Sequence, residues 1–187
     1  MLEKQVVLRV SKGNGNFIMN TGTVRIYYGD GQGKTAAALG CAIYKICKRG
    51  SVIIIQFLKK KDPEEIEFFR CLEPKLKVFH FQKSNQCFEE LDGPERKEVE
   101  MSMKNGLSYA RKVLLTGECS TLVLDEVLGL VDYGIATEEE IIRILDLRSE
   151  DTDIILTGRV LGSGLLEYAD AAYEVCIRKN DLPQAYT

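Results

Sequence analysis

The sequence lacks the residue patterns that several classes of protein require. Its 187 residues include no tryptophan and only one histidine, His80. This histidine alternates with Phe79 and Phe81 in a strand-like run, which favours a packed or surface position over a catalytic one. We therefore identify no Ser-His-Asp or Cys-His arrangement of the kind that activates a nucleophile. If the protein is an enzyme, we expect it to rely on electrostatics and a reactive substrate in place of a strong protein base.

Long apolar runs and paired cysteines are also missing. No stretch approaches the ~20 apolar residues of a membrane-spanning helix, and the first residues do not resemble a signal peptide. The six cysteines form no C-x-x-C pair, which argues against a zinc site or a thioredoxin-type motif. These features predict a cytoplasmic protein without a membrane partner, whose thiols are reduced and mostly buried.

Neither sign of charge is in large excess. The formal net charge of −3 argues against a general nucleic-acid-binding surface, and the short run at residues 59–61 (three lysines) is expected to be a solvated loop. Hydrophobic residues make up 45% of the chain and charged residues 28%, as in ordinary soluble domains. The length predicts one domain with a single core.

A glycine-rich segment carries the first chemical signal. It lies between an apolar strand-like run, residues 24–28, and a helix predicted over residues 35–48, and it ends in Gly-Lys-Thr. This context favours a phosphate-binding loop over a glycine hairpin, because glycines let backbone amides converge on an anion at a helix N-terminus. Lys34 supplies a positive charge for phosphate oxygens, and the Thr35 hydroxyl can bind Mg²⁺. The residues expected to bind nucleotide are Gly29, Asp30, Gly31, Gln32, Gly33, Lys34, Thr35 and Ala36.

Alternating strand and helix signals continue after this segment. They predict a single-domain α/β fold over residues 22–187, P-loop NTPase-like (RecA-like), with a mostly parallel sheet and helices on both faces. Residues 1–21 are interpreted as an N-terminal extension, in which residues 6–10 could form a short strand. The helix over 35–48 is apolar nearly all round and is expected to be buried against the sheet. Helix starts are predicted at Asp62, Asp92 and Thr137, the first and last with capping boxes. The other predicted strands cover residues 51–57, 77–81, 121–126, 153–157 and 172–177.

Polar residues follow three of these strands. Asp125 and Glu126 come directly after an apolar run, about 90 residues beyond the glycine-rich loop. One carboxylate could bind Mg²⁺ while the other orients a water or a substrate group; the alternative is a strand that ends in solvated acids. Gln56 and Arg159 end two further strands at the same predicted edge. Each could contact a ligand in the cleft, and for each a role at the surface is equally compatible with the sequence.

These segments together resemble the P-loop ATP:corrinoid adenosyltransferases. The glycine loop is shortened in the manner of that family, with three residues in place of the common four between Gly29 and Gly33. The Leu-Thr-Gly-Arg segment that ends at Arg159 is the other specific part. The resemblance covers roughly residues 23–178. The matching segments are residues 28–35, 37–40, 56–59, 122–126, 156–159 and 166–170.

The resemblance implies an enzyme that uses ATP and a cobalamin or other corrinoid as substrates. A Co(I) corrinoid attacks C5′ of ATP and triphosphate leaves, which agrees with the lack of a catalytic base because Co(I) is itself a strong nucleophile. By motif match, Lys34 and Arg159 act on the triphosphate, and Thr35 with Glu126 binds Mg²⁺. The family also implies that ATP lies in the loop in the opposite direction to most P-loop proteins. A reductase that delivers Co(I) corrinoid and a second copy of the chain in a homodimer are compatible partners.

Two motifs of the family are altered in this sequence. Ala36 stands where the family usually has a second threonine after Gly-Lys-Thr. The corrinoid-facing segment usually contains Phe-x-Trp, whereas this chain has Phe88-x-Glu90. Residues 82–92 are expected to be a mobile loop that places Phe88 on the corrinoid. Two alternatives stay open: a P-loop ATPase or kinase that cleaves the β–γ bond, and a nucleotide-binding family member without corrinoid chemistry.

Overall fold

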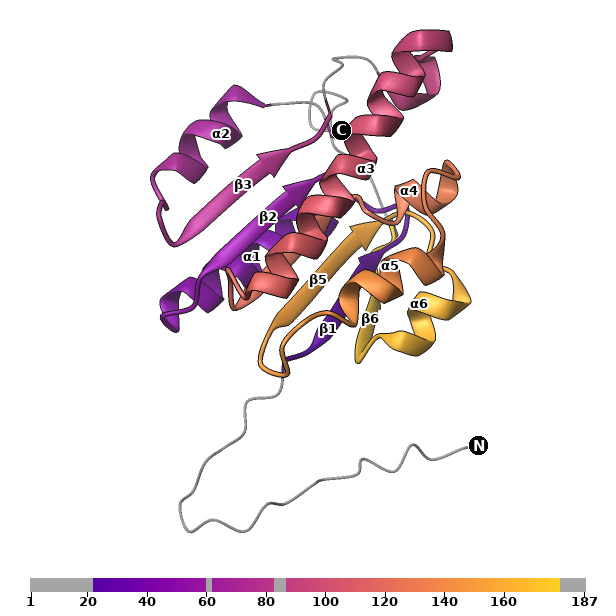
Figure 1. Ribbon diagram of the computed structural model, residues 1–187. Coiled ribbons are helices and arrows are strands. Elements are labelled where there is room, and N and C mark those ends of the chain that lie inside the picture. The colour runs from indigo at the N-terminus through magenta and orange to yellow at the C-terminus, as the bar shows by residue number, and fades with distance from the viewer. Residues whose placement is uncertain (1–21, 60–61, 83–86, 179–187) are drawn as a thin grey trace, which may run out of the picture.

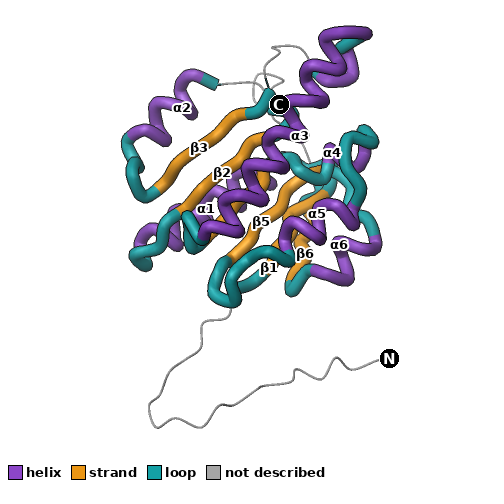
Figure 2. Tube along the Cα trace, viewed as in Figure 1, coloured by secondary structure: helices purple, strands orange, loops and turns teal. Residues whose placement is uncertain are grey.

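The protein is an α/β domain built on one parallel sheet. A computed structural model describes residues 22–59, 62–82 and 87–178, so the extension predicted over residues 1–21 lies outside the described residues. In the described part, the strand order is β3-β2-β4-β5-β1-β6 and every neighbouring pair is parallel. Figure 1 shows the sheet with its helices, and Figure 2 separates the two kinds of element by colour. The predicted fold class is confirmed.

The predicted elements are present in these ranges, with ends shifted by a few residues. The strands are β1 (Val24–Tyr28), β2 (Val52–Gln56), β3 (Leu76–His80), β4 (Thr121–Asp125), β5 (Asp153–Gly158) and β6 (Ala171–Glu174). The helices are α1 (Lys34–Cys47), α2 (Pro63–Arg70), the 3₁₀ helix η1 (Phe88–Glu90), α3 (Gly93–Thr116), α4 (Gly129–Asp132), α5 (Glu138–Leu145) and α6 (Ser163–Tyr168). Helix α4 was not predicted, since one turn is too short to show helical periodicity.

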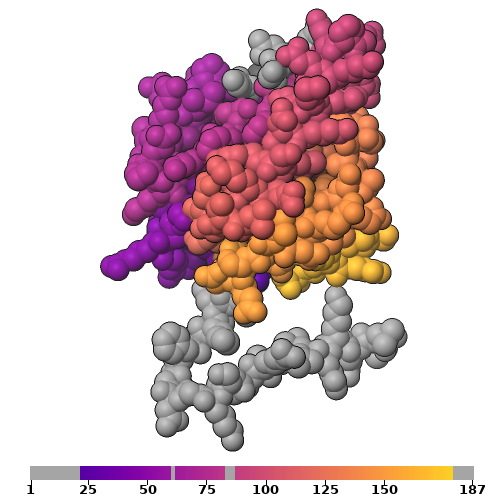
Figure 3. Space-filling model, in the orientation of Figure 1, coloured from indigo at the N-terminus to yellow at the C-terminus, as the bar shows by residue number. Residues whose placement is uncertain are grey.

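Both faces of the sheet are covered, which explains the continuous apolar run of β2. Its five residues are all buried. Ile53 and Ile55 join a core with α3 and α5, while Val52 and Ile54 join a second core with α1 and α2. Side chains of a strand alternate between its two faces, so a strand covered on both sides carries apolar side chains at successive positions, here from Val52 to Ile55. Figure 3 shows α3 and the orange segment that contains α5 lying across the first of these faces.

Helix α1 corrects the expectation of burial all round. Ala38 and Ala42 are fully buried against the sheet, but Ile43 is 36% exposed and Tyr44 is 61% exposed. The helix forms the outer layer of its face, so only one stripe of it meets the core. The expectation that most thiols are buried is also wrong. Cys119 is the single buried cysteine of the six, and all six are unpaired.

Helix starts follow the predicted capping residues, with two differences. Thr137 and Glu140 form a complete capping box at the start of α5. Asp62 accepts hydrogen bonds from the amides of Glu64 and Glu65, but the Glu65 carboxylate pairs with Lys59 (2.9 Å) and completes no capping box. Asp92 occupies the N-cap position of α3 without a side-chain capping bond. In the part of the chain that the structure describes, no helix combines the length and apolar character needed to cross a membrane.

Candidate functional site

The glycine-rich loop connects β1 to α1 and is closed around the Lys34 side chain. The ammonium group donates to the backbone oxygens of Gly29 (2.7 Å) and Gly31 (3.0 Å), and the residue is only 9% exposed. Gly29 and Gly33 have φ angles of 113° and 100°, which side chains other than glycine rarely tolerate. The two glycines therefore allow the chain to curl around Lys34 before the helix begins.

Two backbone amides of the loop donate hydrogen bonds to other segments of the protein. Gly29 N–H donates to the backbone oxygen of Arg159 (2.9 Å), and Gly31 N–H donates to that of Val175 (2.8 Å). These bonds dock the loop on the segments that follow β5 and β6. The first bond of the helix runs from the Ala37 amide to the Gly33 oxygen (2.8 Å), so the amides of residues 33–36 have no acceptor within the helix. These four amides, with the positive end of the helix, form the anion-binding part of the loop.

Asp125 is the centre of a buried hydrogen-bond network behind the loop. It is 1% exposed, and its Oδ1 accepts from the hydroxyls of Thr35 (2.9 Å) and Thr157 (2.7 Å). Its Oδ2 accepts from the Gln56 amide (3.2 Å), which lies beside it in the β2–β4 register. Gln56 is fully buried, so the alternative of a surface role is wrong, and its amide holds the Asp125 carboxylate. The contact between Gln56 and a nucleotide stays a prediction. The alternative of solvated acids at the end of β4 is wrong for Asp125.

Glu126 takes a different direction from its neighbour. Its backbone has a φ of 60°, and its amide donates to the Thr157 hydroxyl (2.8 Å). A positive φ is uncommon for residues other than glycine, and it changes the direction of the side chain relative to the preceding strand. The Asp125 side chain is therefore buried at the edge of the sheet, whereas the Glu126 side chain lines the cleft. Burial, and then the adjacent Asp125 charge, raises the pKa of Glu126; Lys34, Arg159 and Lys59 act in the opposite sense.

A cleft of about 630 Å³ opens at this edge of the sheet, within the size range of small-molecule sites. It begins at the phosphate loop and Glu126 and ends at a wall that comes from η1 and α4. Arg159, which is exposed, reaches the cleft from the end of β5. The lining residues are Thr35, Leu58, Lys59, Cys87, Phe88, Glu89, Glu126, Gly129, Asp132, Tyr133 and Arg159.

The structure brings together most of the predicted site residues. Asp30 lies apart from them: it is exposed and lines a neighbouring hollow of about 480 Å³, together with Arg159. Gln32 and Ala36 are exposed at the loop and at the first turn of α1. Lys59 was expected in a solvated loop, but its ammonium lies 3.8 Å from Asp125 Oδ2. His80 is half-buried and lines a small cavity next to α2, away from the phosphate loop.

Phe88 was expected in a mobile loop, but it lies buried in a short helix. The segment that follows residues 83–86, which lie outside the described residues, forms η1, and Phe88 is only 3% exposed there. Its ring packs against Tyr133, with ring centroids 4.8 Å apart, and the Arg96 guanidinium lies over it at 4.5 Å. Phe88 therefore belongs to the hydrophobic core as well as to the edge of the cleft.

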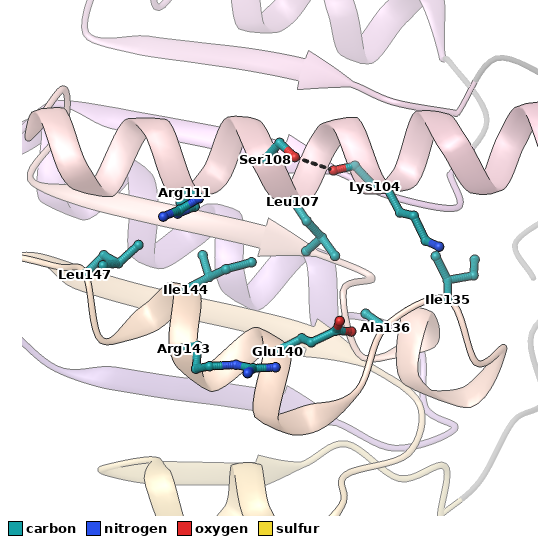
Figure 4. A pocket seen from close by; sticks show the side chains of 10 residues that line it. All are labelled: Lys104, Leu107, Ser108, Arg111, Ile135, Ala136, Glu140, Arg143, Ile144 and Leu147. Carbon is teal, nitrogen blue, oxygen red and sulfur yellow. Dashed lines mark hydrogen bonds between the residues drawn. The ribbon is translucent and has the colours of Figure 1, made fainter.

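A second groove, of about 500 Å³, lies between α3 and α5 (Figure 4). Its floor is apolar, with Leu107 and Ile144 among its residues, and Lys104, Arg111 and Arg143 lie along it. None of the predicted site residues lines this groove, and neither the loop nor the end of a strand reaches it. The cleft beside Thr35 is therefore the candidate active site.

The fold and the loop together define a P-loop nucleotide-binding protein. Two solved structures share the fold. The flagellar accessory protein FlaH from Methanocaldococcus jannaschii matches with a TM-score of 0.54 and 15% identity, over 83% of this chain and 71% of that chain. The KaiC-like protein PH0186 from Pyrococcus horikoshii OT3 matches with a TM-score of 0.51 and 18% identity, over 86% of this chain and 76% of that chain.

The sequence comparisons specify the family. Residues 20–185 match the sequence model of the ATP:corrinoid adenosyltransferases BtuR/CobO/CobP, so the chain belongs to this family of enzymes. A corrinoid adenosyltransferase of Escherichia coli (strain K12) is 27% identical over 154 residues, which is 82% of this chain and 76% of that protein. The resemblance inferred from the sequence is confirmed.

Proposed function

We propose that this chain transfers the 5′-deoxyadenosyl group of ATP to the cobalt of a reduced corrinoid and releases triphosphate. The observation that carries the proposal is the composition of the cleft. One end is lined by Thr35, beside the anion-binding amides and the enclosed Lys34, and the other end is lined by Tyr133, whose ring packs on the buried Phe88. A polyphosphate matches the first end, and a large ring system matches the second.

The proposed step needs no protein base, because no proton moves. An electron pair on Co(I) forms the cobalt–carbon bond at C5′, the C5′–O bond breaks, and its electrons leave on the triphosphate. The chain contributes position and charge: Lys34 and the first amides of α1 stabilise the negative charge that grows on the leaving group. Arg159 offers a second cation, which lines the cleft.

The residues around Thr35 fit Mg²⁺. The Thr35 hydroxyl and the Glu126 carboxylate are hard oxygen ligands at the same edge, and Asp125 holds the Thr35 side chain through a hydrogen bond (2.9 Å). The described residues contain no group of three or more His, Cys, Asp or Glu that could hold a metal by themselves. Magnesium usually takes only one or two protein carboxylates when phosphates supply further ligands. When bound, the ion would neutralise charge on the triphosphate.

The two carboxylates are predicted to differ in a Mg²⁺ titration of activity. Glu126→Gln should raise the Mg²⁺ concentration needed for half-maximal rate by roughly tenfold or more, since it removes a charged ligand. Asp125→Asn should affect Mg²⁺ dependence less and thermal stability more, because a buried acceptor of three hydrogen bonds is replaced. The reverse ranking would show that Asp125 is the direct ligand.

Anaerobic mixing of the protein with MgATP and chemically reduced cobalamin tests the proposed transfer. Formation of a light-sensitive cobalt–carbon product, followed by absorbance, is expected only when ATP and Co(I) are both present. The same mixture with oxidised cobalamin is the matched control. ATP consumption without any adenosylated corrinoid would favour an ATPase or kinase, and ATP binding without turnover would favour a nucleotide-binding protein that has lost the chemistry.

A further inference from the structure

The second aromatic residue of the Phe-x-Trp pattern has no replacement within its own segment. Glu90 occupies that position, and its carboxylate turns back to accept from the Cys87 amide (3.3 Å) in the capping box of η1. The side chain is therefore engaged in closing its own turn, and Glu90 is absent from the lining of the cleft. The wall needs another source of apolar surface for a large ring system.

Phe88 offers little of that surface. Only 3% of it is exposed, because Arg96 lies over its ring and Tyr133 packs against it. A ring enclosed in this way supports the wall of the cleft but presents almost none of its own area to a substrate.

Tyr133 presents the ring that Phe88 does not. It is partly exposed, lines the same cleft as Thr35 and Glu126, and directly follows α4. Its hydroxyl donates to the Glu89 carboxylate, so the ring is held at both ends by η1: the face on Phe88 and the hydroxyl on Glu89. The hydrogen bond lowers the pKa of Glu89, which keeps this acceptor charged.

Gly129 allows the Leu58 side chain to pack close to α4. A Cβ at that position would lie 2.7 Å from Leu58 Cδ1 and 3.9 Å from Tyr133 Cε2. The absence of a side chain at Gly129 therefore leaves room for Leu58, which lines the cleft together with Gly129 and Tyr133.

We infer that Tyr133 is the residue that contacts the corrinoid ring, with Phe88 and Glu89 as the residues that position it. This inference rests on the proposed function, because it names the residue that recognises the second substrate. The corrinoid would contact the apolar face of the Tyr133 ring, and the hydrogen bond from the Tyr133 hydroxyl to Glu89 fixes the orientation of that ring. Phe88 keeps a supporting role behind it.

Two variants separate the ring from the hydroxyl. Tyr133→Leu, which removes the aromatic face, should raise the KM for corrinoid by roughly tenfold while leaving ATP affinity within about twofold of the parent. Tyr133→Phe, which keeps the ring and loses the bond to Glu89, should raise that KM by only a few-fold. Tyr44→Leu on the exposed side of α1 is the matched control and should change neither value.

Equilibrium dialysis with Co(II) cobalamin gives a readout that does not depend on turnover. Weaker corrinoid binding by Tyr133→Leu than by the parent supports the inference even if the parent fails to transfer the adenosyl group, which would overturn only the proposed function. Equal corrinoid binding and equal KM for folded parent and Tyr133→Leu would overturn the inference while leaving the transfer in place. A parent that binds no corrinoid would overturn both.

Discussion

Lys34→Ala should weaken ATP binding by roughly 10- to 150-fold and reduce turnover accordingly. This magnitude follows from the loss of one charge-assisted contact to phosphate, about 1.5–3 kcal/mol. The ammonium also donates to the Gly29 and Gly31 oxygens, so its removal leaves the loop less well held. Isothermal titration calorimetry with MgATP measures the affinity, and thermal unfolding shows whether the variant is folded.

The control for this variant is Lys48→Ala. Lys48 follows α1 and is exposed, with its ammonium over the Tyr44 ring, 5.4 Å from the centroid. It carries the same charge as Lys34 at the opposite end of the helix, so both variants change the net charge of the protein by the same amount. ATP affinity should be unchanged in Lys48→Ala. A folded Lys34→Ala protein with the parent's affinity would remove the loop from the active site.

Glycine-to-alanine changes along the loop and α1 should form a ranked series in stability. Gly29→Ala should be the most damaging, because its φ of 113° is strained for alanine and the new Cβ would lie 2.6 Å from the Val175 oxygen. Strain alone costs on the order of 1–3 kcal/mol, and for a chain of this length each kcal/mol lowers Tm by about 2–4 °C. ATP binding should fall with it, since the loop must move.

Two other glycines separate the effect of backbone strain from the effect of the steric clash. Gly33 has a φ of 100°, but a Cβ added there would meet no atom within 4 Å, so Gly33→Ala should show the strain without the clash. Gly40 is exposed within α1, has an ordinary φ and has equally open surroundings, and Gly40→Ala should stabilise the protein by about 0.5–1 kcal/mol. Chemical unfolding of the three variants checks the order. If Gly29→Ala were as stable as Gly40→Ala, the docking of the loop on Val175 would be incorrect.

The phosphate end of the cleft could be predicted because it is built from adjacent residues. Glycines, Lys34 and Thr35 lie in one short segment, and the parallel sheet places the end of β4 at the same edge. Local spacing and a rule about sheet edges were therefore enough. The direction of each side chain was not predictable, since it depends on one dihedral angle: the positive φ of Glu126 separates it from Asp125.

The other parts of the site could not be predicted, because they depend on contacts between segments that are distant in the sequence. The buried position of Gln56 follows from its register with Asp125, 69 residues away in sequence. Thr157 was part of a recognised segment, but its role as the bridge between Asp125 and Glu126 is visible only in three dimensions. Tyr133 follows a four-residue helix and meets η1 across 44 residues of sequence. A lone tyrosine after an apolar run gave no signal that could have singled it out.

The bond in ATP that breaks is the most direct test of the proposed chemistry. Phosphorus NMR of a reaction with reduced cobalamin identifies the phosphate product without reference to the corrinoid. Transfer at C5′ predicts inorganic triphosphate in an amount equal to the adenosylcobalamin formed, and a matching decrease of both products with Lys34→Ala. ADP and orthophosphate as the primary products, formed equally with or without corrinoid, would contradict the account.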